Sequence, residues 1–368
     1  MKRVADYLNF SDFKNEADEK LLPIIKDVVQ KQFSTNEYSL YQKNKKIAII
    51  VALCTILPLI ITLATLIPGL MNSNGSATLS GIVFLGITVI LIIVASVYNG
   101  LRLKAAHNIS KSILFNINKA DLHLKAINIL QPKWKFLGSE YECDNPRYSY
   151  DKSTRKFQRN EYYTYRPSVV PSDAYIADIS NCQTIVIDDK YPAHFSNAHW
   201  IYETQTADGR GNRTTQETHF YVTLLKIDAR YLESRHRTSF MYFGSKWYNP
   251  AGMKSIKLEN NDFNRLFKLQ SNDEMKMRML FTPLAMENMS NMWNRNYSST
   301  NIRNISVSAQ NDIIYMSFLS PAGFGLIDVP KFAKDPIRTT NFIYSDILKD
   351  IFSLYFLLQL VYIPNYLY

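Results

Sequence analysis

The sequence predicts an α+β protein: a transmembrane helical hairpin, a cytoplasmic helical stalk, and an antiparallel-sheet domain with C-terminal helices. Two long runs without a charged side chain, residues 47–70 and 79–98, predict the hairpin. Short strand-like runs follow one another over residues 173–269, and strands without intervening helices favour antiparallel pairing. The expected parts are an N-terminal helical segment, the hairpin, a juxtamembrane helix and the α+β domain, at residues 1–46, 47–99, 100–130 and 131–368.

The N-terminal segment precedes the hairpin with a helical pattern. Ser11 is expected to cap its start, with Asp12 in the first turn. Pro23 interrupts the pattern, so the segment is expected as two helices or as one that begins there.

Both apolar runs are long enough to cross a membrane. A helix of about twenty residues spans the roughly 30 Å hydrocarbon core. One central Lys or Asp would oppose insertion by about 2.5–3.5 kcal/mol, and neither run contains one. The alternative of two helices buried in a soluble core would need more surrounding chain than the sequence supplies. Pro58 in the first run predicts a kink.

Basic residues flank the hairpin, while the turn at residues 71–78 carries no charge. These residues are Lys43, Lys45 and Lys46 before it and Arg102, Lys104 and Lys111 after it. Cytoplasmic flanks of membrane helices are enriched in Lys and Arg. We therefore expect both chain ends in the cytoplasm. The three cysteines, two of them isolated outside the hairpin, fit a reducing compartment.

Residues 100–130 repeat the helical pattern, which ends at Gln131-Pro132. A basic, Tyr-rich segment follows over residues 133–170. Its candidate contacts to an anionic surface are Lys152, Arg155, Lys156, Arg159 and Arg166. With a formal net charge of +10, the chain is expected to be attracted to anionic lipid. We favour this over nucleic-acid binding, and favour an exposed loop leading into an edge strand over a polyanion groove.

The remaining strand predictions come from β-type runs bounded by turn residues. The expected strands are residues 175–179, 184–187, 200–205, 218–227, 238–243, 302–308 and 313–319. Residues 208–212 have the composition of a hairpin tip.

The most specific stretch is residues 258–287. Residues 263–269 read as a strand, Ser271 and Glu274 as a capping box, and Thr282-Pro283 as a second helix start. A Leu-Glu pair, spaced Phe residues, Asp-x-x-x-x-Arg-x-x-x-Thr-Pro and Met-Glu resemble the bacterial two-pass membrane family classed as domain of unknown function 3137. The matching residues are Leu258, Glu259, Phe263, Phe267, Asp273, Arg278, Thr282, Pro283, Met286 and Glu287. The resemblance extends over the hairpin and about residues 162–291. It implies a two-pass architecture in the bacterial inner membrane, and no activity.

Residues 343–363 form a strongly apolar helix pattern whose uninterrupted part is shorter than a membrane span. A core helix is favoured over an interfacial helix, and both over a third span.

No His-Glu-x-x-His, paired Cys-x-x-Cys, Gly-x-Ser-x-Gly or Walker motif is present. His194, His199, His219 and His236 gather in the strand region, but their spacing fits no common zinc site. The sequence therefore indicates no cofactor or metal and no recognisable enzyme.

The favoured function is a membrane-anchored cytoplasmic module that holds a protein partner, with the lipid bilayer as its second contact. Two alternatives remain: a hydrolase-like enzyme acting on membrane-derived substrates, and an anionic-lipid-binding domain. The identity of the partner and the oligomeric state are open.

Overall fold

The computed structural model describes residues 7–71, 75–139, 157–188, 190–207, 213–230, 238–243, 252–310 and 312–366. The chain divides into two compact units. Unit 1 comprises Met1–Leu21, Asp121–Leu326 and Ser345–Tyr368, and unit 2 comprises Leu22–Ala120 and Ile327–Tyr344. Each unit is described by itself below.

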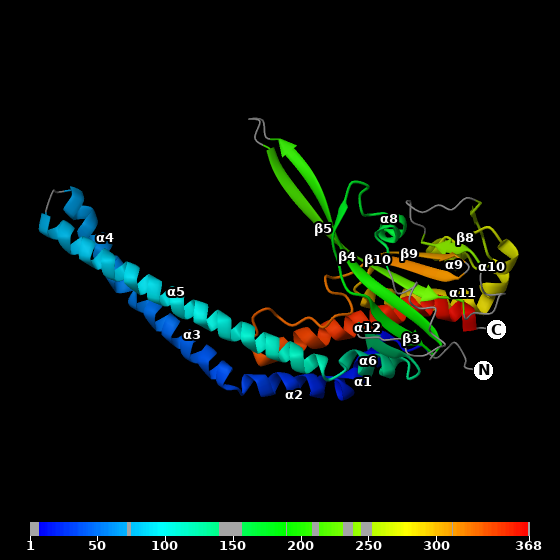
Figure 1. Ribbon diagram of the computed structural model, residues 1–368, viewed down its shortest axis with the longest axis horizontal. Helices are drawn as coiled ribbons and strands as arrows, with labels where there is room; N and C mark the ends of the chain where they lie inside the picture. The colour runs from blue at the N-terminus through cyan, green and yellow to red at the C-terminus, as the bar shows by residue number, and fades with distance from the viewer. Residues whose placement is uncertain are drawn as a thin grey trace. The chain divides into compact units, whose positions relative to one another are not determined.

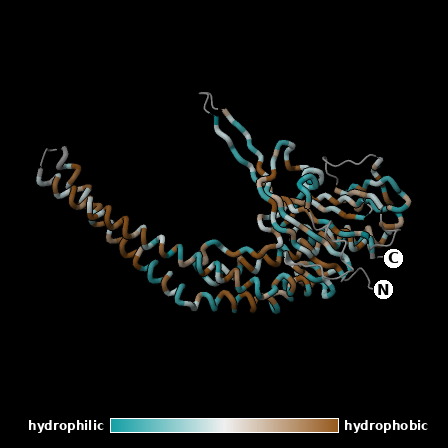
Figure 2. The backbone as a smooth tube through the Cα atoms, viewed as in Figure 1, coloured by the Kyte–Doolittle hydropathy of each residue, from teal (hydrophilic) through white to brown (hydrophobic). Residues whose placement is uncertain are grey.

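Unit 2 is built on long helices. They are α2 (Leu22–Phe33), α3 (Asn36–Cys54), α4 (Ile56–Met71) and α5 (Gly75–Asn118). α3 and α4 pack along α5 (Figure 1), which is the helical hairpin that the sequence predicts. Figure 2 shows hydrophobic residues along α4 and the adjoining parts of α3 and α5.

The apolar side chains of this hairpin face outwards. Leu57 and Leu79 are 66% and 65% exposed, although a soluble protein would bury such residues. Three helical stretches of the described chain are long and apolar enough to cross a membrane: Asn36–Pro68, Thr78–Asn118 and Pro336–Asn365. In the first two, 11% of the most apolar window is buried, against 89% in the third. The exposed surface of the first two therefore suits a lipid environment.

A break separates α3 from α4. Proline lacks an N–H, and its ring clashes with the carbonyl four residues earlier, which for Pro58 belongs to Cys54. α3 ends at Cys54, and the Thr55 N–H donates back to the Val51 carbonyl at 3.1 Å. The break agrees with the kink expected at Pro58.

At the N-terminus, α1 (Phe10–Lys20) and α2 are separate helices, as Pro23 predicts. The expected start at Ser11 is wrong, because α1 begins at Phe10 with Asn9 as its N-cap residue. α6 (Leu122–Leu130) ends before Gln131-Pro132, as expected.

Unit 1 is built on an antiparallel sheet, as predicted. Its strands are β1 (Lys135–Gly138), β2 (Tyr175–Ile179), β3 (Gln183–Ile187), β4 (Tyr191–Ala207), β5 (Arg213–Asp228), β6 (Phe240–Tyr242), β7 (Lys254–Ser255), β8 (Gln270–Ser271), β9 (Arg303–Gln310) and β10 (Ile313–Leu319). The order is β1-β3-β4-β5-β10-β9-β6-β8-β7, with β2 paired to β4. The predicted runs at residues 175–179, 184–187, 200–205, 218–227, 238–243, 302–308 and 313–319 each overlap one of these strands, although β4 and β5 are longer than expected. The expected hairpin tip at residues 208–212 lies outside the described residues.

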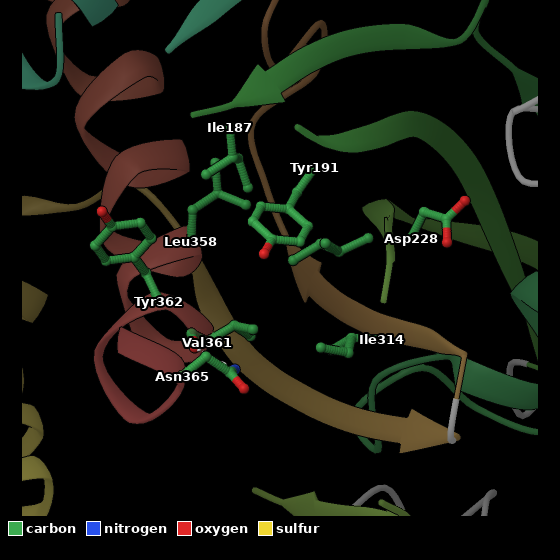
Figure 3. A pocket seen from close by; sticks show the side chains of 9 residues that line it. Ile187, Tyr191, Asp228, Ile314, Leu358, Val361, Tyr362 and Asn365 are labelled. Carbon is green, nitrogen blue, oxygen red and sulfur yellow. Dashed lines mark hydrogen bonds between the residues drawn. The ribbon is translucent and has the colours of Figure 1, made fainter. Parts of the chain in front are cut away.

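Helices cover both faces of the sheet. α12 (Pro336–Tyr366) packs on one face, where its Leu358 and Val361 meet Ile187 and Ile314 of the strands (Figure 3). The extensive burial of α12 favours its placement as a core helix. On the other face, α8 (Arg159–Tyr165) packs Tyr162 and Tyr165 against the core around Trp200. The sequence predicts an exposed loop in this segment, and this prediction is wrong for residues 159–165, which form α8. The helix was missed because its apolar contacts come from strands that are distant in the sequence.

The stretch after β7 corrects two predictions. Residues 263–269 are not a strand: α9 (Asn261–Phe267) is a helix whose Asn260 side chain accepts from the Phe263 N–H. Ser271 does not cap α10 (Glu274–Leu280), because Asp273 accepts from the Lys276 N–H. Thr282 and Pro283 do start α11 (Pro283–Asn296), as predicted. A short 3₁₀ turn, η4 (Tyr297–Ser299), follows α11.

Candidate functional site

The residues of the 258–287 motif meet where α9, α10 and α11 join. Phe263 and Phe267 are buried and stack on each other at 4.6 Å between ring centres. Phe263 also lies 5.4 Å from the ring of Phe281, at the end of α10. The Asn264 side chain accepts from the Leu258 N–H at 2.9 Å and donates to the Leu258 carbonyl at 2.7 Å. These contacts fix α9 against the segment before it.

Arg278 connects the two charged parts of the motif. Its guanidinium donates to the Glu274 carboxylate at 2.7 Å, to the Lys257 carbonyl at 3.3 Å, and to Glu259. The side chains of Arg278, Glu259 and Glu274 are all exposed. Each of the two ion pairs therefore adds little stability on its own. The arrangement orients the turn between β7 and α9 relative to α10.

The remaining motif residues start or anchor helices. Asp273 and Thr282 are N-caps, Pro283 occupies the first position of α11, Met286 is fully buried and Glu287 is exposed. Together the motif residues build a local scaffold, and they bring no group of catalytic side chains together.

Replacing both Thr282 and Pro283 by Ala should lower the free energy of unfolding by about 1 kcal/mol, because the cap bond from the Ala285 N–H, 3.3 Å long, is lost. Thermal unfolding of the full chain in detergent checks this. Glu287→Ala on the same helix is the matched control and should leave the melting temperature unchanged. Equal melting temperatures for both variants would mean that the cap is not formed.

The structure describes two of the five predicted anionic-surface residues, Arg159 and Arg166. Lys152, Arg155 and Lys156 lie outside the described residues. Arg159 donates to the Ile176 carbonyl at 2.7 Å. Arg166 is 7% exposed and its guanidinium lies 5.9 Å from the centre of the Trp200 ring. This burial against the sheet leaves little of the Arg166 side chain accessible to a lipid surface.

The histidines are separated by the sheet. His194 is buried, with its Nδ1 3.0 Å from the Thr184 hydroxyl, whereas His199 and His219 pair on the surface at 3.0 Å. His236 lies outside the described residues. Within the described chain, no three His, Cys, Asp or Glu residues are placed to hold a metal ion.

An ion pair joins a buried lysine of the sheet to a partly buried glutamate of α8, and sequence reasoning missed it. Lys226 is 1% exposed, and its ammonium lies 2.6 Å from the Glu161 carboxylate of α8. The Tyr315 hydroxyl donates to the same carboxylate at 3.2 Å. Burial lowers the pKa of Lys226, while the hydrogen bond and charge of Glu161 oppose that shift.

This ion pair fastens α8 to the sheet. Lys226 is paired in register with His194 on one neighbouring strand and with Tyr315 on the other. A signal was present in the sequence: Lys226 continues the alternation of Val222 and Leu224, which places a lysine on a buried face.

The cavity between α12 and the sheet is small (Figure 3). Its volume of about 30 Å³ has room for about two water molecules. The Tyr362 hydroxyl donates to Asp188 at 3.0 Å, and Asp228 accepts from Arg230 Nε at 2.9 Å. Among the described residues, the Asn365 Oδ1 that lines this cavity is buried without a hydrogen-bond partner. The size of the cavity suits water and not an organic substrate.

The outer ends of β4 and β5 form a two-stranded arm, defined here as residues 202–207 and 213–218. β2 pairs with β4 only as far as Ile201, and β10 pairs with β5 only from Val222. Within the described chain, the arm strands therefore pair only with each other, from Tyr202 opposite Thr218 to Ala207 opposite Arg213. Figure 1 shows the arm extending beyond the other strands of the sheet, and Figure 2 shows that it is mostly hydrophilic.

Comparison with known proteins adds one finding. Residues 181–360 match the model of a family described as "Protein of unknown function (DUF3137)". The matched segment is about half of the chain, runs from just before β3 into α12, and contains the whole 258–287 motif. No curated protein and no solved structure matches the chain.

Proposed function

Because residues 181–360 belong to the DUF3137 family and share one chain with exposed apolar helices, we propose that this protein is a membrane-anchored interaction module. The pair α3–α4 and the helix α5 cross the bacterial inner membrane, giving a two-pass protein with both ends in the cytoplasm. The DUF3137 domain binds a protein partner there. The partner adds a β-strand to the arm.

The membrane part of the proposal rests on the exposed apolar surface of unit 2. Side chains such as Leu57 would be costly in water, at about 25 cal/mol for each Å² of apolar surface. Lipid removes that cost without a protein partner. The basic residues at one end, among them Lys43, Lys46 and Lys104, support the cytoplasmic orientation.

The arm is the observation that carries the binding part of the proposal. An isolated two-stranded hairpin is marginally stable in water. Within the described chain, the outer edges of the arm pair with no further strand, and such open edges are a template for an added strand. Strand addition obtains affinity from main-chain hydrogen bonds, so it suits a surface dominated by Thr, Gln and Glu side chains.

Removing the arm should abolish partner binding and leave the fold intact. Tyr202 and Thr218 are directly opposed, so residues 203–217 can be replaced by an Asn-Gly turn that keeps the strand register. Full-length and arm-less chains are expressed in the native cells, crosslinked, and compared by quantitative mass spectrometry. We expect a defined protein that is crosslinked to the full-length chain and lost from the arm-less chain.

The matched control is Met275→Ala with Met279→Ala, two exposed side chains on α10. This variant should keep the partner. Both variants must remain in the membrane fraction and unfold cooperatively, which separates loss of binding from loss of folding. Recovery of the same crosslinked proteins with the arm-less chain would refute the proposed role of the arm.

A further inference from the structure

A segment of unit 2 far along the chain lies against the membrane helix α5. We call residues 327–335 the strap; they precede α12 and belong to the same unit as α5. The Ser110 hydroxyl of α5 donates to the Pro330 carbonyl at 2.7 Å and accepts from the Ala333 N–H at 2.8 Å. His107 Nδ1 lies 3.3 Å from the Lys331 carbonyl. The strap is thus bonded to α5 at two successive turns.

Two lysines of the strap lie next to Phe332, the aromatic residue through which the strap contacts α5. Lys331 and Lys334 are exposed, and their ammonium groups lie 5.7 and 5.9 Å from the centre of the Phe332 ring. Phe332 in turn lies 6.2 Å from the His107 ring, between ring centres. The aromatic contact with α5 therefore places both cations beside the membrane helix.

The same end of the hairpin carries exposed lysines on both α3 and α5. Exposed lysines at this end are Lys43 and Lys46 on α3 and Lys104 on α5. The strap also carries two acidic side chains: Asp335 accepts from the Arg338 N–H at 2.7 Å, and desolvation raises the pKa of the Asp328 carboxyl. The strap lysines therefore extend an existing positive field.

The strap lies within reach of lipid headgroups if α5 crosses the membrane. His107 is nine residues beyond Tyr98, the end of the uncharged run, which is about 13 Å along the helix axis. The headgroup layer occupies roughly 5–8 Å of that distance. The distance left between His107 and the outer surface of the headgroup layer is therefore no longer than about 8 Å, the Debye length at physiological salt. Charges on the strap can act on the headgroups over such a distance. Any helix tilt shortens the gap further.

We infer that the strap lysines Lys331 and Lys334, together with the basic helix ends, form a binding site for anionic phospholipid headgroups. This inference rests on the proposed membrane anchorage. It moves the lipid contact from the Tyr-rich segment of residues 133–170 to the strap. It also makes the DUF3137 segment itself touch the bilayer, because the strap lies inside residues 181–360.

Photocrosslinking of the full chain in lipid nanodiscs tests the inference. The photoreactive residue p-benzoylphenylalanine replaces Phe332 in the strap, Leu57 within the first apolar run, or Gln30 on α2. Discs contain phosphatidylcholine alone or with phosphatidylglycerol, and lipid adducts are measured by mass spectrometry. We expect adducts at position 57 in both discs, adducts at 332 only with phosphatidylglycerol, and none at 30.

The charge dependence provides a second measurement that needs no photoreactive residue. Native mass spectrometry counts the phosphatidylglycerol retained by the detergent-purified chain. Lys331→Gln with Lys334→Gln should weaken retention by about fivefold for each lysine. The charge-matched control, Lys26→Gln with Lys31→Gln on α2, should retain lipid like the unsubstituted chain.

The outcomes separate the two proposals. Adducts at 57 but no more at 332 than at 30, or equal lipid retention by both double variants, would overturn the headgroup site and leave the membrane anchor standing. Absence of adducts at 57 would overturn the membrane anchor itself.

Discussion

Phe352→Ala should lower the free energy of unfolding by about 3–5 kcal/mol. Phe352 of α12 is 1% exposed, and its ring centre lies 5.0 Å from that of Phe10 and 6.0 Å from that of Phe13. Truncation therefore removes buried apolar surface and leaves a cavity between α12 and α1. Both ring contacts come from α1, so the measurement requires the full chain. It is unfolded by heat or denaturant in detergent.

Phe342→Ala on the same helix is the matched control. Phe342 is 47% exposed, so the same substitution there should change stability by much less. A Phe352→Ala chain that unfolds like the Phe342→Ala chain, while binding membranes less well, would establish α12 as an interfacial helix in place of a core helix.

Glu161→Gln should destabilise the protein by about 3–5 kcal/mol at neutral pH, because it leaves the buried ammonium of Lys226 without its counter-charge. The double variant Glu161→Leu with Lys226→Met should recover most of that loss, since neither charge then remains buried. Glu16→Gln removes one partner of the exposed pair with Lys20 and should cost at most about 1 kcal/mol. Equal losses in Glu161→Gln and Glu16→Gln would mean that Lys226 reaches water.

The loss in Glu161→Gln should also depend on pH. Burial lowers the pKa of Lys226 below its ordinary value of 10.5, and removing Glu161 removes the groups that oppose the shift. Between the lowered pKa and 10.5, the unfolded chain binds more protons than the folded chain, so stability rises with pH in that window. The difference between variant and parent should therefore shrink as the pH approaches 10.5. A difference that stays constant would contradict a charged lysine buried in the folded protein.

Features set by neighbouring residues could be predicted from the sequence. The hairpin follows from two uncharged runs, the strands from alternating β-branched and aromatic residues, and the start of α11 from Thr282-Pro283. Local sequence patterns do not decide the secondary structure where a strand signal and a helix signal fall on the same residues. Residues 263–269 carry strand-forming aromatics, but the Asn260 cap and the packing of Phe263 and Phe267 make α9 a helix. Asp273, and not Ser271, caps α10 because the Ser271 hydroxyl donates to the Ser239 carbonyl on a neighbouring segment.

The sequence alone thus determined that this chain has membrane-type helices, an antiparallel-sheet domain and the 258–287 motif, because charge, periodicity and capping act over a few residues. Only the tertiary structure placed Lys226 beside Glu161, buried Arg166 against Trp200, and brought the strap to Ser110 of α5. These contacts join residues tens to hundreds of positions apart, so no local pattern specifies them. They form because a buried polar group without a partner is costly, and the fold decides which partners are near.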